Sequence, residues 1–262
     1  MIDNQIRVGA VVLAGGRIPA SLAHLSAHRA LLRVRGRLLL DYLFAALQAS
    51  PSIRASTVVA PEEALAELSA LPGTLTPAGD SLVENMQRGA RALAALQPTH
   101  LLFITGDIPL VTPEGIEGYL AASLQSGAAL TYPIIPRAVC EQGFPGAKRT
   151  FVRIREGVFT GGNAIFTTES LLTDKQALIQ SLYIARKQPL KLARILGLAT
   201  VLRMLTGTLS LPYLERVATR ILGAPAAAVI TPYAEIGFDV DKISDLEAVE
   251  RALAGKSINN RK

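Results

Sequence analysis

The stretch Val11-Val12-Leu13-Ala14-Gly15-Gly16 ends an apolar run that begins at Val8. An apolar run of this length, bounded by glycines, predicts a strand buried on both faces. A turn of small residues lets the backbone come very close to a ligand, and its bare N–H groups can form an anion-binding concavity. The alternative is a tight strand-to-helix turn without a ligand, because Gly-rich turns are common between elements.

The composition is that of a globular chain with an aliphatic core. Of 262 residues, 50% are hydrophobic and 18% are charged, and tryptophan is absent. The length fits one large domain or two small ones. The single cysteine, Cys140, excludes an internal disulfide and fits a reducing compartment. Neither a signal-peptide pattern nor an uncharged apolar run of transmembrane length is found, so the sequence predicts a cytoplasmic protein.

Strand and helix patterns alternate over the first part of the chain, and the clearest strands are apolar throughout. Strands buried on both faces by helices imply a mostly parallel sheet in a three-layer α/β/α, Rossmann-like fold. Strands are expected over 7–13, 57–60, 101–105, 130–135, 150–155, 163–167 and 229–240, and helices over 38–48, from 61, over 81–97, from 112 and over 244–253.

Residues 170–225 differ from the rest and predict a helical insertion into a single domain that spans residues 1–262. Helical spacing covers 173–187, 190–205 and 211–222. The part from Leu171 to Ala228 carries eight basic and two acidic side chains. Its net charge is therefore +6, the same as that of the whole chain. A basic excess favours phosphate-bearing partners, but it does not choose between nucleotide, nucleic acid and membrane surface.

Two glycine-containing turns are expected at strand carboxyl ends, where ligands bind in open α/β sheets. They are Ala14-Gly15-Gly16 and Gly106-Asp107. A carboxylate such as Asp107 can hold Mg²⁺, although an aspartate before Ile108-Pro109 can also simply start a turn. Asp239 and Asp241 lie two apart in a segment expected to be a strand, so both could face the site. Alternatively, Asp241 only lies near the cap of the last helix.

Taken in order, these motifs resemble the MobA-like nucleotidyltransferases, which include molybdenum cofactor guanylyltransferases and their cytidylyl- and uridylyl-transferring relatives. The resemblance covers about Arg7 to Leu253, apart from the insertion, and implies a nucleotide-diphospho-sugar transferase (GT-A-like) fold. Its motifs are Leu13-Ala14-Gly15-Gly16, Gly106-Asp107-Ile108-Pro109-Leu110, Gly161-Gly162-Asn163 and Asp239-Val240-Asp241.

The resemblance also implies roles for individual residues. Nucleotide contacts would come from Leu13, Ala14, Gly15, Gly16 and Gly106, with Gly79, Asp80, Ser81 and Asn85 as the base-reading segment. Metal ligands would be Asp107 with Asp239 or Asp241, and Gly161, Gly162 and Asn163 would form the acceptor-side loop. Two structural alternatives stay open: Ser81 as a plain helix cap with Glu84, and the two glycines as a β-bulge or hairpin turn.

The chain departs from the family at its phosphate-binding cations. The family usually has an arginine after the glycines and then a lysine in a Lys-x-Leu context. Here Arg17 is the candidate for the arginine, and Arg29, in Arg29-Ala30-Leu31, takes the place of the lysine. Arginine presents a planar fork and lysine a compact charge, so the phosphate geometry differs. Lys148 and Arg149 are further candidates for phosphate contacts.

The expected reaction transfers a nucleotidyl group from a nucleoside triphosphate, GTP or CTP, to a phosphorylated small molecule and releases pyrophosphate. Mg²⁺, with Mn²⁺ as a substitute, would be the cofactor. An acceptor phosphate is already ionised near neutral pH, so no general base is needed. One alternative is a GT-A-type glycosyltransferase, which the single mid-chain aspartate at position 107 disfavours. Another is a degenerate, non-catalytic nucleotide-binding module, which the exchange at Arg29 suggests.

Expected partners are therefore a triphosphate and a phosphorylated acceptor, and no nucleic acid. The acceptor could be a sugar phosphate, a pterin phosphate or a lipid-linked phosphate. Three roles stay open for the basic insertion: covering the acceptor site, forming a homodimer in place of a monomer, or peripheral contact of residues 171–225 with an anionic membrane.

Overall fold

One large sheet runs through the computed structural model, which describes residues 5–147, 149–175 and 197–259. Its nine strands follow from the apolar, β-branched runs of the sequence. They are β1 (Val8–Leu13), β4 (Ile53–Ala60), β5 (Thr74–Pro77), β6 (His100–Thr105), β7 (Leu130–Pro136), β8 (Val152–Ile154), β9 (Gly157–Gly161), β10 (Ala164–Thr168) and β11 (Ala226–Ile230).

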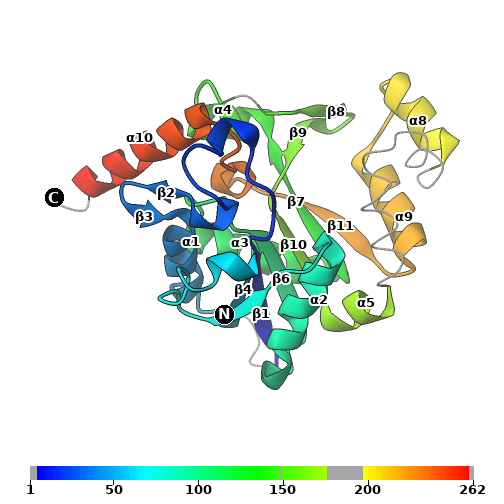
Figure 1. Cartoon of the computed structure of the whole chain (residues 1–262). Helices are drawn as coiled ribbons and strands as arrows, with labels where there is room; N and C mark the ends of the chain where they lie inside the picture. The colour runs from blue at the N-terminus through cyan, green and yellow to red at the C-terminus, as the bar shows by residue number, and fades with distance from the viewer. Residues whose placement is uncertain (1–4, 148, 176–196, 260–262) are drawn as a thin grey trace.

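The strand order is β5-β4-β1-β6-β10-β7-β9-β8, and β11 pairs with β7. β1 lies between β4 and β6 and is parallel to both, whereas β10 is antiparallel to β6 and β7. The chain therefore reverses its direction across the sheet at β1, which creates a crevice at the carboxyl ends of these strands. The predicted α/β architecture with a mostly parallel sheet is confirmed (Figure 1).

Helices cover both faces of the sheet (Figure 1). None of those among the described residues has the length and hydropathy needed to cross a bilayer. The α-helices are α1 (Leu39–Gln48), α2 (Leu82–Ala92), α3 (Pro113–Gln125), α4 (Arg137–Gly143), α5 (Glu169–Asp174), α8 (Leu198–Leu205), α9 (Leu211–Leu222) and α10 (Ile243–Asn259). Short 3-10 turns cover η1 (Ala20–Leu22), η2 (Arg29–Leu31), η3 (Glu62–Ala64), η4 (Ala94–Leu96) and η5 (Ala234–Gly237), and β2 (Arg33–Val34) and β3 (Arg37–Leu38) form a small hairpin.

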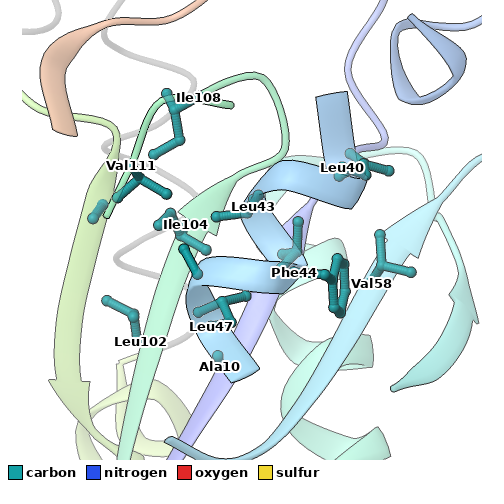
Figure 2. Packing of buried hydrophobic residues seen from close by; sticks show 14 of the residues in the cluster. Ala10, Leu40, Leu43, Phe44, Leu47, Val58, Leu102, Ile104, Ile108 and Val111 are labelled. Atoms are coloured by element: carbon teal, nitrogen blue, oxygen red, sulfur yellow. The ribbon is translucent and has the colours of Figure 1, made fainter. Parts of the chain in front are cut away.

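The alternation of side chains along β1 builds two cores, one on each face of the sheet. Ala10 and Val12 belong to the cluster that contains Phe44 of α1, and Figure 2 shows Phe44 packed toward this face. Val11 points the other way, into the cluster that contains Met86 of α2. All of these side chains are at most 4% exposed. Truncating a buried aromatic such as Phe44 to alanine costs roughly 3–5 kcal/mol, so this packing holds the crevice rigid.

Several predicted elements differ in extent. The helix expected from residue 61 is only the 3-10 turn η3, and the helix expected to reach Gln97 ends at Ala92. Helical spacing of Leu65, Leu68 and Leu71 follows the Glu62-Glu63 pair, but the backbone here closes successive turns with bonds between residues three apart, such as Leu68 N–H to the Leu65 carbonyl at 3.1 Å. In the insertion, α8 and α9 fit the expected helices, whereas residues 176–196 lie outside the described residues. The seven-residue α4 was not predicted, because it carries no capping side chain.

Candidate active site

The glycine turn, defined as Leu13–Gly16, lies where β4, β1 and β6 end together. Leu13 is paired with Thr105 of β6, and its carbonyl accepts the Gly106 N–H at 3.0 Å. On the other side, the Ala14 N–H donates to the carbonyl of Val59 in β4 at 2.8 Å. The turn predicted to bind nucleotide and the Gly106-Asp107 turn are therefore direct neighbours in the crevice.

The surroundings of the two glycines in the turn differ. A Cβ on Gly15 would lie 2.8 Å from Nδ2 of Asn85 and 3.0 Å from Cβ of Ala78, so packing within the protein already requires glycine there. A Cβ on Gly16 would meet nothing within 4 Å. Packing within the protein therefore does not require glycine at position 16, and the open space beside it leaves room for a ligand.

The segment expected to read the base forms the start of α2. Ser81 is the N-cap, and its hydroxyl accepts the Glu84 N–H at 3.1 Å, so the helix-cap alternative for Ser81 holds. The Glu84 carboxylate in turn accepts the Asp80 N–H at 2.9 Å. The side-chain carbonyl of Asn85 accepts the Gly79 N–H at 2.7 Å. This network fixes the segment beside Gly15, where the positive end of the α2 dipole faces the crevice.

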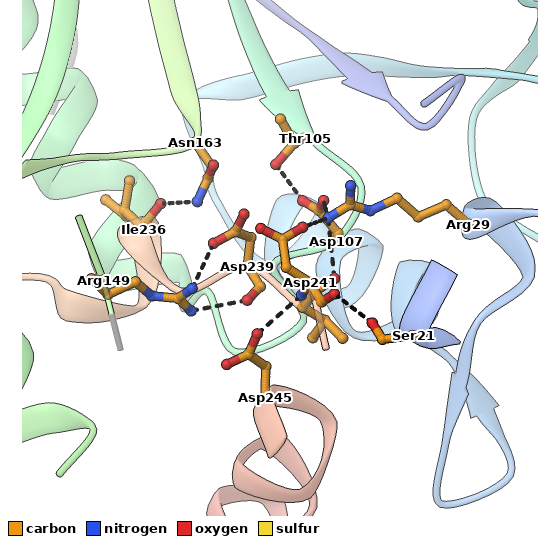
Figure 3. Close-up of polar contacts among 11 residues, drawn as sticks. Ser21, Arg29, Thr105, Asp107, Arg149, Asn163, Ile236, Asp239, Asp241 and Asp245 are labelled. Carbon is orange, nitrogen blue, oxygen red and sulfur yellow. Dashed lines mark hydrogen bonds and ion pairs between the residues drawn. The ribbon is translucent and has the colours of Figure 1, made fainter. Parts of the chain in front are cut away.

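Three carboxylates converge beyond the end of β6; we call Asp107, Asp239 and Asp241 the carboxylate centre (Figure 3). Each offers one oxygen, and these oxygens lie within 4.8 Å of one another. The main chain holds them together, because the Val240 N–H donates to the Asp107 carbonyl at 3.0 Å. A cluster of carboxylate oxygens at this spacing fits a hard divalent cation such as Mg²⁺.

The predicted strand over 229–240 is wrong beyond Ile230, where β11 ends. A 3-10 turn, Ala234–Gly237, follows, and residues 238–241 have no sheet partner. The two aspartates therefore converge through local contacts and not through strand alternation. The Asp241 N–H donates to the Asp245 carboxylate at 3.1 Å, and the Ser21 hydroxyl donates to the Asp241 carbonyl at 3.2 Å. Asp241 also lies just before α10, as the alternative proposed.

Two arginines form ion pairs with the acids of the carboxylate centre. Nη2 of Arg29 forms ion pairs with Asp107 and with Asp241, the latter at 2.6 Å. On the opposite side, Nη1 of Arg149 lies 3.1 Å from Oδ1 of Asp239, and its Nη2 donates to the Asp239 carbonyl at 2.9 Å. The Arg149 guanidinium also stacks 4.5 Å from the centroid of the Phe238 ring. Two positive groups thus face three negative ones, which leaves one negative charge in excess.

Burial and repulsion between the acids disfavour the ionised form of two of these carboxylates, Asp107 and Asp239. Burial raises the pKa of Asp107, against the opposing effects of Arg29 and of the Thr105 hydroxyl, which donates at 2.6 Å. The pKa of Asp239 is raised to about 6 by burial and by the charges of Asp107 and Asp241, while Arg149 opposes the rise. A divalent cation would favour the ionised form of all three, so the donor set fits a metal.

The predicted acceptor-side loop borders the same centre. The Asn163 carbonyl accepts the Thr105 N–H at 3.0 Å, and the Asn163 N–H donates to the Ile236 carbonyl at 2.9 Å. The Asn163 side-chain amide also donates to Ile236, at 3.4 Å. Asn163 therefore ties the end of β6 to the segment that leads to Asp239.

The glycines of this loop have packing reasons of their own. β9 ends at Gly161 and β10 begins at Ala164, and both strands run antiparallel to β7. A Cβ on Gly161 would overlap the hydroxyl of Tyr132, and one on Gly162 would lie 2.8 Å from Cγ of Pro133. The glycines therefore allow the chain to pass close to β7.

The other two cations that the sequence suggested for phosphate contacts are Arg17 and Lys148. Arg17 is exposed and has no hydrogen-bond or ion-pair partner among the described residues, and Lys148 lies outside them. Thr105 and Ser21 were missed by the sequence analysis. Thr105 is the polar last residue of an apolar strand, which is a usable signal, whereas nothing local distinguishes Ser21.

Comparison with known proteins places this crevice in a family. A model described as the MobA-like NTP transferase domain matches residues 10–205, more than half of the chain. The chain belongs to the MobA-like NTP transferase domain family. Members of this family are nucleotidyltransferases, so the predicted family and enzyme class are confirmed.

Individual relatives agree with this family. A solved structure described as a hypothetical transferase from Thermus thermophilus is 37% identical, with a TM-score of 0.81, and the match covers 92% of this chain and 100% of the other. The curated 2-C-methyl-D-erythritol 4-phosphate cytidylyltransferase of Neorickettsia sennetsu is 29% identical over 140 residues, which are 50% of this chain and 58% of that protein. The chain therefore spans little more than half the length of this relative.

A more distant structure shares the fold alone. The 4-diphosphocytidyl-2C-methyl-D-erythritol synthase of Anaerococcus prevotii is 12% identical, with a TM-score of 0.60, and the match covers 96% of this chain and 100% of that one. The predicted nucleotidyltransferase type of α/β fold is thus confirmed.

Proposed function

We propose that the chain is a divalent-cation-dependent nucleotidyltransferase that moves a nucleoside monophosphate from a triphosphate to a phosphorylated small molecule. The observation that carries this proposal is the carboxylate centre directly beside the glycine turn, with Gly106 hydrogen-bonded to Leu13 between them. Phosphate and metal sites that share one crevice are what transfer at an α-phosphorus requires.

Asp107, Asp239 and Asp241 would hold Mg²⁺, or Mn²⁺ in its place. When bound, the ion neutralises charge on the phosphates. The chain's own residues supply the rest. Backbone N–H groups of the glycine turn would receive the triphosphate, and Arg17 and Arg29 would offset its charge.

The bond changes follow from this placement. An oxygen of the acceptor phosphate attacks the α-phosphorus, the bond from that phosphorus to the bridging oxygen breaks, and pyrophosphate leaves with the electron pair. The acceptor phosphate is already ionised, so the protein moves no proton. Positioning and electrostatic stabilisation account for the catalysis. Gly161, Gly162 and Asn163 would line the acceptor side, because Asn163 borders the end of β6.

CTP is the first candidate nucleotide, and GTP is the second. Support for CTP comes from the curated relative, which is named a cytidylyltransferase. In this chain the fixed segment Gly79, Asp80, Ser81 and Asn85 would meet the base beside Gly15.

We further propose one domain over residues 1–262, with the insertion at about 170–225 beside the acceptor side. Its support is that β11, which follows the insertion, returns to the sheet and pairs with β7. Peripheral membrane contact through 171–225 and formation of a homodimer are the alternative roles of the insertion, and the chain is a monomer or a homodimer. We also propose a cytoplasmic location and no nucleic-acid partner. Flotation with anionic vesicles tests the membrane contact, and light scattering tests the homodimer.

The proposed reaction is tested by screening the four common triphosphates with Mg²⁺ against a library of phosphate esters and measuring pyrophosphate release. We expect release with CTP or GTP and one class of ester. Asp107→Ala should lose release and bind Mg²⁺ and nucleotide more weakly, whereas Glu63→Gln, at an exposed position, should behave as wild type. If Asp107→Ala binds both ligands as well as wild type, the proposed metal site is wrong.

A further inference from the structure

Arg29 reaches the carboxylate centre from η2 and places one nitrogen against two of its three acids. Nη2 is paired with Oδ2 of Asp107 and with Oδ1 of Asp241, and it donates to the Val240 carbonyl at 3.1 Å. The side chains of Arg29 and Asp107 are 20% and 11% exposed, so their ion pair is largely shielded from water, whereas the side chain of Asp241 is 54% exposed. Figure 3 shows the guanidinium group reaching both of these aspartates from the side of η2.

This nitrogen lies where a cation shared by Asp107 and Asp241 would have to bind. A Mg²⁺ ion shared by Asp107 and Asp241 would lie about 2.1 Å from an oxygen of each. The Arg29 nitrogen already lies 2.6 Å from the Asp241 oxygen and pairs with the Asp107 oxygen as well. Two cations cannot share that position, so the arginine and the metal exclude each other as long as Arg29 keeps this conformation.

A second observation shows that the pairing leaves Arg29 incompletely satisfied. Its Nε is buried and has no hydrogen-bond partner among the described residues. A buried donor without a partner is costly, particularly on a charged group. A triphosphate in the adjacent glycine turn would offer oxygens to the whole planar fork, which binds phosphate well.

We propose that Arg29 is the resident counter-cation of the empty carboxylate centre and that it yields this place only when a triphosphate gives its guanidinium another partner. Metal and triphosphate then bind cooperatively, because each needs the same movement of Arg29. The metal binds weakly by itself. This inference rests on the proposed function, since it assumes that the carboxylate centre holds the metal and that the glycine turn holds the triphosphate.

A general loss of positive charge is the rival explanation for any effect of changing Arg29. Arg149 provides the matched control, because it also pairs with one acid of the centre, Asp239, at 3.1 Å. Arg149 contacts that acid from the side of Phe238 and does not bridge two acids. Removing either arginine deletes one charge, but only the removal of Arg29 vacates the bridging position.

The experiment titrates the full chain with Mn²⁺ in the absence of nucleotide and follows free Mn²⁺ by electron paramagnetic resonance. We expect Arg29→Gln to bind Mn²⁺ at least about tenfold more tightly than wild type, and Arg149→Gln to change the affinity by less than about threefold. A smaller gain in Arg29→Gln, or an equal gain in Arg149→Gln, overturns the inference. Thermal unfolding checks that each variant is folded. If Arg29→Gln is not folded, Arg29→Met, which keeps the aliphatic stem of the side chain, takes its place.

A second titration, with CTP and then GTP present, separates this inference from the proposed function. Wild type should then bind Mn²⁺ beyond what the nucleotide binds by itself. If neither wild type nor Arg29→Gln does so with either nucleotide, the proposed metal site has failed, and the inference fails with it. If wild type binds Mn²⁺ as tightly as Arg29→Gln without nucleotide, only the role of Arg29 is overturned.

Discussion

The glycine turn and the carboxylate centre are neighbours, but they are built in opposite ways. The turn is made of backbone held by the hydrogen bonds of three adjacent parallel strands, with Gly106 and Val59 as its partners. The centre is made of charged side chains from distant parts of the chain, and its contact between Arg29 and Asp241 spans 212 positions. The turn depends on empty space, whereas the centre depends on the balance of charge.

This difference predicts two kinds of mutational effect. A change in the turn acts through volume, so it disturbs stability, ligand approach or both. A change in the centre alters charges that the fold already tolerates poorly, as the raised pKa values of Asp107 and Asp239 show. A change at the carboxylate centre should therefore lower activity with little loss of stability. A change in the glycine turn, except at Gly16, should lower both.

The largest expected effect is on activity at the carboxylate centre. Asp107→Asn keeps the shape of the side chain and removes its charge, and Arg29 retains Asp241 as a partner. We expect turnover to fall by about 10²–10³-fold, the range seen when one electrostatic contact to the transition state is lost. Pyrophosphate release measures the activity of this variant, and thermal unfolding measures its stability. A large loss of stability would erase the contrast with the turn.

The next effect is on stability in the glycine turn. Gly15→Ala places a methyl group 2.8 Å from Nδ2 of Asn85, and Asn85 is buried and bonded to Gly79. We expect the free energy of unfolding, measured with urea, to fall by about 1–2 kcal/mol because overpacking must be relieved. An unchanged midpoint would mean that the turn is not held as rigidly as its hydrogen bonds suggest.

Gly16→Ala is the paired and smaller test. The added methyl group meets nothing within 4 Å, so stability should stay within about 0.5 kcal/mol of wild type. Nucleotide binding should weaken by about three- to tenfold, which corresponds to roughly 0.7–1.4 kcal/mol, if the ligand fills that space. Equilibrium dialysis with labelled CTP and GTP measures this. Unchanged affinity for both would favour the alternative of a turn without a ligand.

The smallest effect concerns the amino end of β6, opposite the site. Burial lowers the pKa of His100, whose ring stacks on Phe166 with centroids 5.0 Å apart. At His100 the unfolded chain binds more protons than the folded chain below pH 6.5, so the contribution of this residue to stability should decline as the pH falls, whereas the raised pKa of Asp239 acts in the opposite direction. His100→Phe keeps the stacking and should reduce this decline. Urea midpoints at pH 5 and pH 7.5 provide the measurement, and an identical decline in both proteins would contradict the assignment.

The same contrast explains what could be predicted from the sequence. The glycine turn was predictable because a strand and its following turn are local patterns. The sequence predicted that Asp107, Asp239 and Asp241 lie together, as they do, but the reason given for Asp239 and Asp241 was wrong, since no strand carries them. The bridging position of Arg29 depends on tertiary placement, and no local pattern encodes it.

The late position of Asp239 and Asp241 along the chain has a consequence for synthesis on the ribosome. The strands β1, β4 and β6 that form the glycine turn are all made by Thr105, and the sheet is complete at Ile230. A nascent or prematurely terminated chain that ends at Ile230 would contain the glycine turn and only one of the three acids, Asp107. Under the proposed function, such a product lacks two of the three proposed metal ligands, so nucleotidyl transfer could begin only after the last segment has been made.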